Sequence, residues 1–252
     1  MESQLPQDVL TIIPSFIDAG NDQISLRNLC LASSIFLCPC QSILFKNILL
    51  SGTNKSSPTT GQRLLELLER SPHIVKYVKS VNICEAPPLF NRESWLSTDR
   101  ALPEALNKLD IKRITSFSLC LYGGNSRYPW QRVLPATQAS IIEICPSTSL
   151  MELSLQQAPI PLIGLCGPSL KRLSVQDADL STMSAVAIPR TQRNSKAKIL
   201  LAHLHLGETS QYTDFARYFP YLTDTENRIE LDRVKQIYVK GEDVTRIAPT
   251  YT

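Results

Sequence analysis

The chain has 252 residues, of which 43% are hydrophobic and 19% are charged, a composition typical of folded soluble proteins with one or two domains. A formal net charge of +3 is too small to indicate a nucleic acid or a membrane surface as partner. No segment approaches the ~20 consecutive apolar residues of a membrane-spanning helix, and the first residues lack the pattern of a secretory signal.

The seven cysteines are an odd number and include no Cys-x-x-Cys pair. Without a signal peptide, this favours thiols used as small hydrophobic side chains in a reducing compartment, the cytoplasm or the nucleus. Cys30, Cys38 and Cys40 also lack the paired spacing of a zinc site, so we interpret them as helix-packing residues.

The first 48 residues predict three short helices. The first opens at Leu5-Pro6, because proline is tolerated at a first helical position, and it ends near Pro14. Its apolar stripe consists of Val9, Ile12, Ile13 and Phe16.

A turn at residues 19–23 precedes the second helix, for which Ser25 is the expected N-cap. This helix should direct Leu26, Leu29, Ala32 and Ile35 inward. The third helix is expected from about Pro39 to Ile48. A unit of this length buries little apolar area, so we expect it to be stabilised by contacts with a partner or with the rest of the chain.

These residues resemble the F-box, the adaptor-binding module of Skp–cullin–F-box ubiquitin ligases. The resemblance is carried by Leu5-Pro6 followed by Asp8 and an apolar run, by Leu26–Leu29, by an aromatic residue at Phe36, and by Leu44-Phe45. The closing segment 44–48 is similar to F-box proteins of fungi. The resemblance implies that the adaptor contacts come from Leu5, Pro6, Val9, Leu10, Ile13, Leu26, Leu29 and Phe36. Which of these face the adaptor and which face the head's own core stays open.

The chain after the head begins with a polar linker at residues 51–61 and an amphipathic helix over residues 62–70 that Ser71-Pro72 ends. We therefore expect a head at 1–50, a linker at 51–61 and a second region at 62–252.

That second region repeats the pattern apolar-x-x-apolar-x-apolar. The pattern starts at Val78, Ile114, Leu150, Leu170, Leu201 and Val234, with spacings of 20 to 36 residues. Such spacings predict a solenoid. Helix-like segments lie between the patterns at 100–109, 135–145 and 213–219, and the whole resembles an irregular leucine-rich repeat. The expected fold is thus α/β, with an F-box-like head followed by a leucine-rich-repeat-like solenoid of parallel strands.

Three details of the solenoid follow. Trp95 and Trp130, in two longer inserts, are expected to pack into the core. The basic segment 189–198 should be a surface loop. The last strand, around Val234 to Val239, is followed only by residues 241–252, so we expect an open sheet edge there.

The residues between the apolar positions should share the other face of the sheet, because successive side chains of a strand point to opposite sides. Two per strand give Ser80, Asn82, Ser116, Ser118, Glu152, Ser154, Arg172, Ser174, His203, His205, Gln236 and Tyr238. This face is either a solvated sheet surface or a substrate-binding surface. In the second case the contacts are expected from Glu152, Arg172, His203, His205, Gln236 and Tyr238. With Arg172 as its one arginine, the face does not predict a strongly acidic or phosphorylated ligand.

Catalytic and metal sites are not indicated. The pair His203-x-His205 has no third ligand placed by the sequence, and the one other histidine, His73, lies in no nucleophile signature. We therefore expect no enzyme activity, no cofactor and no metal.

The expected function is the substrate-recognition subunit of a Skp–cullin–F-box E3 ubiquitin ligase, in which the head binds the adaptor and the solenoid binds an unknown substrate protein. Nucleic acid and membrane are not expected partners. The alternative is a non-catalytic interaction scaffold whose helical head only caps the solenoid. Exposure of Leu5, Pro6 and Val9 would favour the first function, and their burial against the repeats would favour the second.

Overall fold

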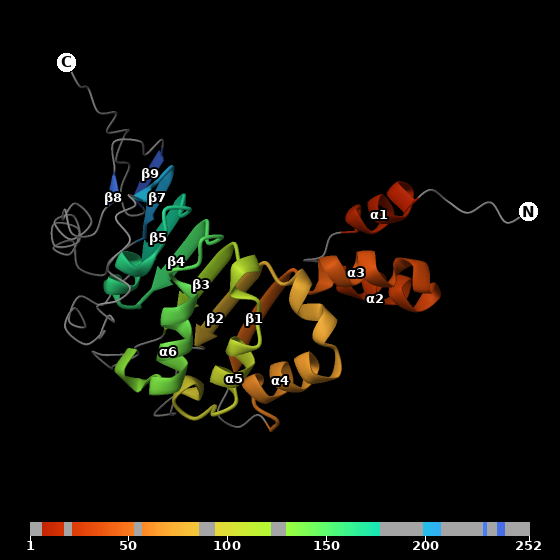
Figure 1. Cartoon of the computed structure of the whole chain (residues 1–252), viewed down its shortest axis with the longest axis horizontal. Helices are drawn as coiled ribbons and strands as arrows, with labels where there is room; N and C mark the ends of the chain where they lie inside the picture. The colour runs from red at the N-terminus through yellow and green to blue at the C-terminus, as the bar shows by residue number, and fades with distance from the viewer. Residues whose placement is uncertain are drawn as a thin grey trace, which may run out of the picture.

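A computed structural model of the chain describes residues 7–17, 22–52, 57–85, 94–121, 130–176, 199–207, 229–230 and 236–239. The fold is α/β. Seven parallel strands form one sheet in the order β1-β2-β3-β4-β5-β7-β9, so its strands lie in the order in which they occur along the chain (Figure 1). A separate two-stranded sheet pairs β6 with β8.

The strands of the large sheet are β1 Asn47–Gly52, β2 Ser80–Glu85, β3 Ser116–Cys120, β4 Glu152–Gln156, β5 Arg172–Gln176, β7 His203–Leu206 and β9 Gln236–Val239; β6 is Ile199–Leu200 and β8 is Ile229–Glu230. The α-helices are α1 Gln7–Ser15, α2 Gln23–Ala32, α3 Leu37–Leu44, α4 Thr60–Arg70, α5 Leu102–Asn107 and α6 Pro135–Ile144. Short 3₁₀ turns are η1 Ser34–Phe36, η2 Pro72–Tyr77, η3 Trp95–Ser97, η4 Ile111–Arg113, η5 Trp130–Arg132 and η6 Ile160–Leu165.

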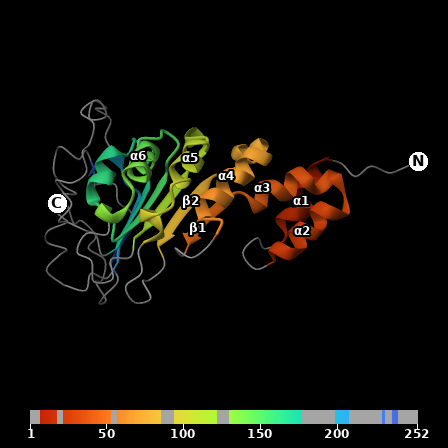
Figure 2. The same cartoon turned by 90° about the horizontal axis from the view of Figure 1, so that it is seen from below.

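The helices are divided between one face of the sheet and one end of it. Helices α4, α5 and α6 cover a single face, and α1, α2 and α3 lie beyond β1, away from the remaining strands (Figures 1 and 2). The Nε2 atom of His73 in η2 lies 3.1 Å from Oε1 of Gln41 in α3, which ties the helical end of the molecule to the sheet.

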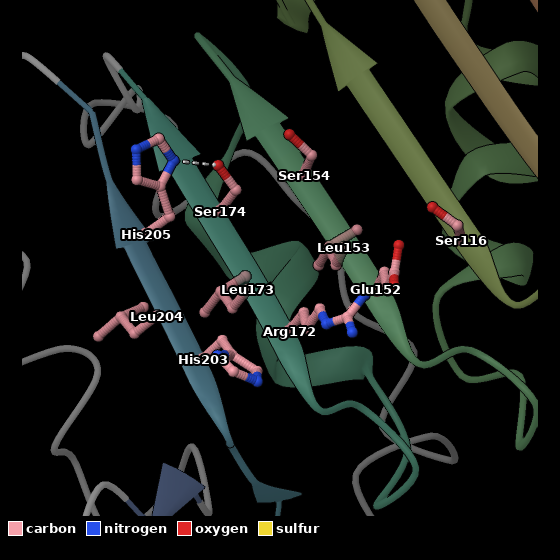
Figure 3. A pocket seen from close by; sticks show the side chains of 10 residues that line it. All are labelled: Ser116, Glu152, Leu153, Ser154, Arg172, Leu173, Ser174, His203, Leu204 and His205. Atoms are coloured by element: carbon pink, nitrogen blue, oxygen red, sulfur yellow. Dashed lines mark hydrogen bonds and ion pairs between the residues drawn. The ribbon is translucent and has the colours of Figure 1, made fainter. Parts of the chain in front are cut away.

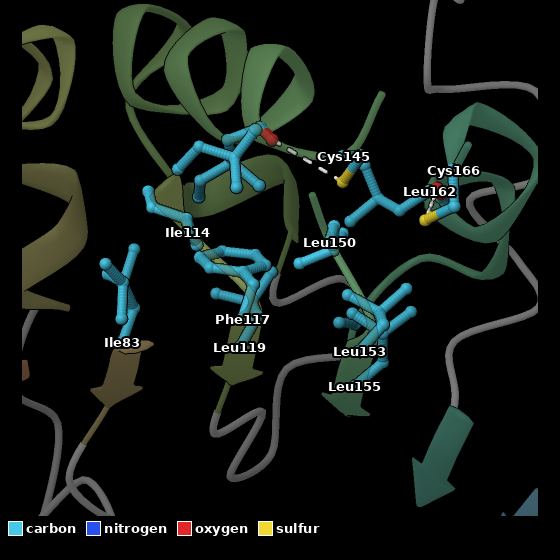
Figure 4. Packing of buried hydrophobic residues seen from close by; sticks show 14 of the residues in the cluster. Ile83, Ile114, Phe117, Leu119, Cys145, Leu150, Leu153, Leu155, Leu162 and Cys166 are labelled. Carbon is cyan, nitrogen blue, oxygen red and sulfur yellow. Dashed lines mark hydrogen bonds between the residues drawn. The ribbon is translucent and has the colours of Figure 1, made fainter. Parts of the chain in front are cut away.

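All six strands expected from the repeated pattern are present. Their central apolar positions are in register, because Val81 pairs with Phe117, Phe117 with Leu153, and Leu153 with Leu173. These side chains are at most 2% exposed. The register therefore stacks one buried residue from each of β2, β3, β4 and β5 into a continuous row beneath the helices (Figure 4).

A seventh strand, β1, was not predicted. The third helix, expected to reach Ile48, ends at Leu44, and Asn47–Gly52 forms the edge strand next to β2. The expected boundaries at 50 and 51 therefore cut through a strand, and α4 begins at Thr60, inside the expected linker. The signal was present in the sequence, because Phe45, Ile48 and Leu50 repeat the apolar pattern before Val78.

The core lies between the sheet and its three covering helices. Each helix contributes two buried aliphatic side chains, Leu64 and Leu68 from α4, Leu102 and Leu106 from α5, and Ile141 and Ile144 from α6. Trp95 and Trp130 are 4% and 1% exposed, so the prediction that both pack into the core is confirmed.

A buried carboxylate joins α4 to the segment before α5. Asp99 is 1% exposed and accepts hydrogen bonds from Oγ1 of Thr59 at 2.8 Å, from N of Gly61 at 2.6 Å and from N of Ala101 at 3.2 Å. A Cβ atom on Gly61 would lie 2.4 Å from N of Leu102, so this close approach requires glycine. Thr59 and Gln62 also form a capping box at the start of α4.

The head differs from its prediction in two details. The N-cap of α2 is Asp22, whose side chain accepts from N of Ser25, so Ser25 lies in the first turn and is not the cap. Leu26 is fully buried as expected, whereas Ala32 and Ile35 are exposed. Helix α1 contains Pro14 and ends at the next residue, as its sequence indicates.

Several expectations fall outside the described residues: Leu5 and Pro6, the helix at 213–219, the loop at 189–198 and the edge after Val239. Among the helices that the structure describes, none has the length and apolar character to cross a membrane.

Candidate protein-binding surfaces

The face of the sheet opposite helices α4, α5 and α6 carries the polar residues that alternate with the core. Three rows cross it, and the third, farthest from the starts of the strands, contains Cys84, Cys120, Gln156 and Gln176. The first row contains Asn47, Ser80, Ser116, Glu152, Arg172, His203 and Gln236, and the second contains Leu49, Asn82, Ser118, Ser154, Ser174, His205 and Tyr238. From β2 to β7 these side chains are half-buried, except for the exposed Arg172. The expected alternation of core and polar face is therefore confirmed over these strands.

A hollow of about 340 Å³ lies on this face, over strands β3, β4, β5 and β7 (Figure 3). Its polar lining consists of Ser116, Glu152, Ser154, Arg172, Ser174, His203 and His205. The serine side chains on β3, β4 and β5 are short, whereas the side chains of Glu152, Arg172, His203 and His205 are longer. The hollow is open and neutral overall, which suits polar side chains of another protein better than an enclosed small molecule.

Two interactions order the longer side chains. Nη1 of Arg172 and Oε1 of Glu152 form an ion pair across β4 and β5, with side chains 63% and 42% exposed. Nδ1 of His205 lies 3.0 Å from Oγ of Ser174 (Figure 3). An exposed ion pair contributes only about 0–1 kcal/mol to folding, so Arg172 and Glu152 can exchange partners at little cost.

Four of the six residues expected to bind a substrate line this hollow: Glu152, Arg172, His203 and His205. The backbones of Gln236 and Tyr238 in β9 pair with His203 and His205, which places both beside the hollow. Their side chains lie outside the described part of the structure. The sequence analysis did not assign Ser116, Ser154 and Ser174 to this site, although it placed them on the same face.

The helical end of the molecule exposes large apolar side chains. Val9 (38%) and Ile12 (49%) are exposed on α1 and Phe16 (84%) is exposed directly after it, and α2 exposes Ile24 (71%) and Leu31 (85%). The spacing of three, four and seven residues places each set along one face of its helix. Exposed apolar groups gathered on a small helical unit are typical of a protein-docking surface.

The structure separates the residues expected to contact an adaptor. Val9 is exposed, Ile13, Leu29 and Phe36 are half-buried, and Leu26 belongs to the head's own core. Leu5, Pro6 and the side chain of Leu10 lie outside the described residues. Sequence reasoning missed the exposure of Ile24 and Leu31, since their positions on α2 were not assigned to either face.

All seven cysteines are free thiols, and three of them are buried. Burial, together with the neighbouring Cys30, raises the pKa of Cys40 to about 11. Burial and the adjacent Cys84 raise the pKa of Cys120 to about 12. The pKa of Cys166 is also raised, through its hydrogen bond with Cys145 and through burial. A protonated thiol is a poor nucleophile, so the buried Cys40 and Cys166 and the half-buried Cys120 are structural residues.

Metal chemistry has no candidate site in the described ranges, where no cluster of three or more His, Cys, Asp or Glu side chains could hold an ion. Comparison with protein-family models, with curated proteins and with solved structures found no match to this chain. The interpretation of both surfaces therefore depends on the chain's own residues.

Proposed function

We propose that this chain is an F-box-type substrate receptor. Its helical head binds the Skp-type adaptor of a cullin ubiquitin ligase, and the polar face of its sheet holds a substrate protein. The chain supplies no catalytic group. It raises the effective concentration of the substrate at the ubiquitin-conjugating enzyme, which accelerates transfer through proximity alone.

The observation that carries this proposal is the exposure of apolar side chains on α1 and α2. Phe16 and Leu31 are more than four-fifths exposed, although the chain has a large core in which apolar residues could lie. Burying such a side chain is worth about 1.5–3 kcal/mol, so a partner that covers this surface gains much of its affinity there. Of the residues that the F-box resemblance assigns to the adaptor, Val9 lies on this surface.

The layout of the remaining chain supports the same proposal. The strands of the large sheet follow one another in chain order, and a helix or 3₁₀ turn covers the same face after β1, β2, β3 and β4. This order supports a leucine-rich-repeat-like solenoid, whose open face is the usual site for a protein ligand.

The proposal is tested by adaptor pull-down with charged substitutions in the head. Val9→Asp with Phe16→Asp on α1, and Ile24→Asp with Leu31→Asp on α2, should each reduce adaptor binding more than tenfold, since each lost anchor costs about 2 kcal/mol. Circular dichroism should show an unchanged melting temperature, because the replaced side chains are exposed.

The matched control is Met151→Asp with Leu200→Asp, which places the same charges at exposed apolar residues of the sheet region, 43% and 38% exposed. This variant should bind the adaptor like the wild type. A wild-type protein that captures no Skp-type adaptor would overturn the proposal.

The second candidate is a scaffold whose head only caps the solenoid. The contact between Gln41 and His73 and the backbone bonds from Lys79 and Ser80 to O of Lys46 favour it, because they attach the head region to the sheet. A cap, however, should bury its apolar residues against the sheet, and the exposure of Val9 supports the docking function instead.

A further inference from the structure

The edge of the sheet at which the strands begin is lined by basic side chains. The residue before the first residue of the strand is Lys46 for β1, Lys79 for β2 and Lys171 for β5. Lys76 precedes β2 in η2, and Lys112 and Arg113 precede β3 in η4. Together with Arg172, the first residue of β5, we name these seven residues the basic rim.

Backbone hydrogen bonds place Lys46 next to Lys79 and connect these two residues, through the starts of β3 and β4, to Lys171. N of Lys79 donates to O of Lys46 at 2.9 Å, N of Thr115 donates to O of Lys79 at 2.8 Å, and the chain of bonds continues through Met151 to N of Lys171. Adjacent strands lie about 4.8 Å apart, so the rim extends about 19 Å from β1 to β5. An extended peptide covers that length with about six residues.

The charge of the rim exceeds that of the whole protein. Its seven basic side chains have two acidic neighbours, Asp110 and Glu152, which leaves five net positive charges against +3 for the full chain. Both acids bind the arginines, Asp110 to Arg113 at 3.0 Å and Glu152 to Arg172. The described structure gives the five lysines no ion pair, although Nζ of Lys76 lies 4.8 Å from the centre of the Tyr77 ring.

The charges behind the rim do not cancel this excess. At the ends of α4 and α5, Arg70 pairs with Glu66, and Lys108 pairs with Glu69 and Glu104. Glu143 near the end of α6 adds a single further negative charge. Even with these groups included, this edge of the sheet retains an excess of positive charge.

We infer that the basic rim binds an acidic segment of the substrate protein, which runs along the rim from β1 and enters the hollow at Arg172. This inference rests on the proposed substrate-receptor function and names the class of substrate. The rim and the hollow are continuous, because Arg172 belongs to both. The polar residues within the strands did not predict an acidic ligand, because Lys46, Lys79 and Lys171 each lie one residue before a strand begins.

Carboxylates fit this surface better than nucleic acid phosphates do. Both arginines of the rim already bind carboxylates in the structure. Their guanidinium groups are therefore not set aside for the bidentate contacts that phosphate favours. Next to the rim, the ring of Tyr77 has the Lys76 ammonium group over one of its faces, which is a face that a stacked base would need. Five separate ammonium groups suit side-chain carboxylates spaced along a peptide.

The test uses the full chain and a fluorescent peptide of alternating glutamate and serine, about 12 residues long and therefore longer than the rim. A second peptide replaces every glutamate with glutamine. In fluorescence anisotropy the glutamate peptide should bind at least about tenfold more tightly, and its affinity should fall steeply as salt is added. Equal binding of the two peptides would overturn the inference.

Two sets of variants distinguish binding by the rim from a general effect of the protein's net charge. Lys46→Gln with Lys79→Gln and Lys171→Gln should weaken the glutamate peptide by about five- to tenfold, as expected for three exposed charge pairs. The control Arg63→Gln with Arg100→Gln and Arg132→Gln removes the same charge near the starts of α4, α5 and α6, and should change affinity less than twofold. Equal losses in both triples would show a nonspecific charge effect and would also overturn the inference.

Two further arms identify the class of anion and keep this inference distinct from the proposed function. A single-stranded oligonucleotide and phosphatidylserine vesicles should compete poorly, and tighter binding of either would overturn the choice of an acidic protein segment. The rim triple should still capture the Skp-type adaptor. Loss of adaptor binding by the head variants alone, with peptide binding intact, would confirm that the two surfaces act separately.

Discussion

The thiols illustrate what single residues contribute to this protein. Cys40, Cys145 and Cys166 are buried among apolar side chains, whereas Cys38 is exposed at the start of α3. The raised pKa values of Cys40 and Cys120 follow mainly from the loss of hydration, which disfavours the thiolate, and that of Cys166 follows first from its hydrogen bond with Cys145 and then from burial. The fold therefore lowers the reactivity of these thiols, and the exposed Cys38 is left as the reactive cysteine.

We expect iodoacetamide to alkylate Cys38 first at pH 8. With a pKa of about 12, the thiolate fraction of Cys120 at that pH is only ~10⁻⁴, so its alkylation should be slow in the folded protein and should accelerate as the pH rises. Peptide mapping by mass spectrometry measures the order of modification. In urea all seven thiols should react at similar rates, and equally fast reaction of Cys120 and Cys38 in the folded protein would contradict the prediction.

The same shifts make stability depend on pH, with a definite sign. A thiol whose pKa is raised by folding ionises more readily in the unfolded chain, so its contribution is complete below about pH 9 and is lost as the pH rises toward 11 and 12. The free energy of unfolding in urea should therefore decline over this range.

At the scale of elements, β1 is the strand on which the domain boundary depends. Its Leu50 is 3% exposed and pairs with Ile83, and Oγ1 of Thr60 donates to O of Ser51 at 2.9 Å. The strand therefore belongs to the sheet, although it follows the head helices directly. The linker between head and sheet is short, because it consists only of the residues between Leu44 and Asn47.

A fragment of residues 45–252 should consequently fold, whereas a fragment of residues 62–252 should be less stable by about 3 kcal/mol or more. The shorter fragment loses the buried Leu50 and the cap of α4 at Thr59. It also loses the backbone N–H of Gly61, which donates a hydrogen bond to the Asp99 carboxylate. Urea denaturation followed by circular dichroism gives both free energies, with the full chain as the reference. Equal stability of the two fragments would show that β1 is not part of the cooperative unit.

The same elements show how far the sequence determines the fold. Six strands could be located because their apolar residues recur at a fixed spacing with a buried row on one side. Strand β1 has the same spacing, but Phe45 also ends the F-box-like pattern, and a short apolar run fits a helix as well as a strand. The N-cap of α2 was misassigned because both Asp22 and Ser25 are residues that cap helices well.

The binding surfaces were predictable to different degrees. The polar face followed from alternation, so Glu152, Arg172, His203 and His205 could be grouped before the structure was known. The hollow among them depends on short serines of three neighbouring strands, of which Ser154 and Ser174 are paired in register, and no single strand reveals this. The rim was not predictable from the strands, since Lys46, Lys79 and Lys171 come together only when the strand starts are aligned.

At the scale of the whole molecule, the two surfaces lie toward opposite ends. The exposed apolar helices lie beyond β1, and the hollow lies over β3 to β7 (Figures 1 and 2). Strands β1 and β5 alone are about 19 Å apart at the usual strand spacing. A partner bound to the head would therefore leave the hollow open to a second protein, as the proposed receptor function requires.

This separation predicts that the two binding events are energetically independent. Combining Val9→Asp and Phe16→Asp with Lys171→Gln, which lies at the start of β5, should give losses of adaptor and peptide affinity equal to those of each set alone, within about 0.5 kcal/mol, because substituted sites more than about 10 Å apart without shared partners are additive. Adaptor pull-down and peptide anisotropy on the four proteins of the cycle measure this. A coupling energy above ~1 kcal/mol would instead show that the head and the sheet change conformation together, as two parts of one switch rather than as two separate docking surfaces.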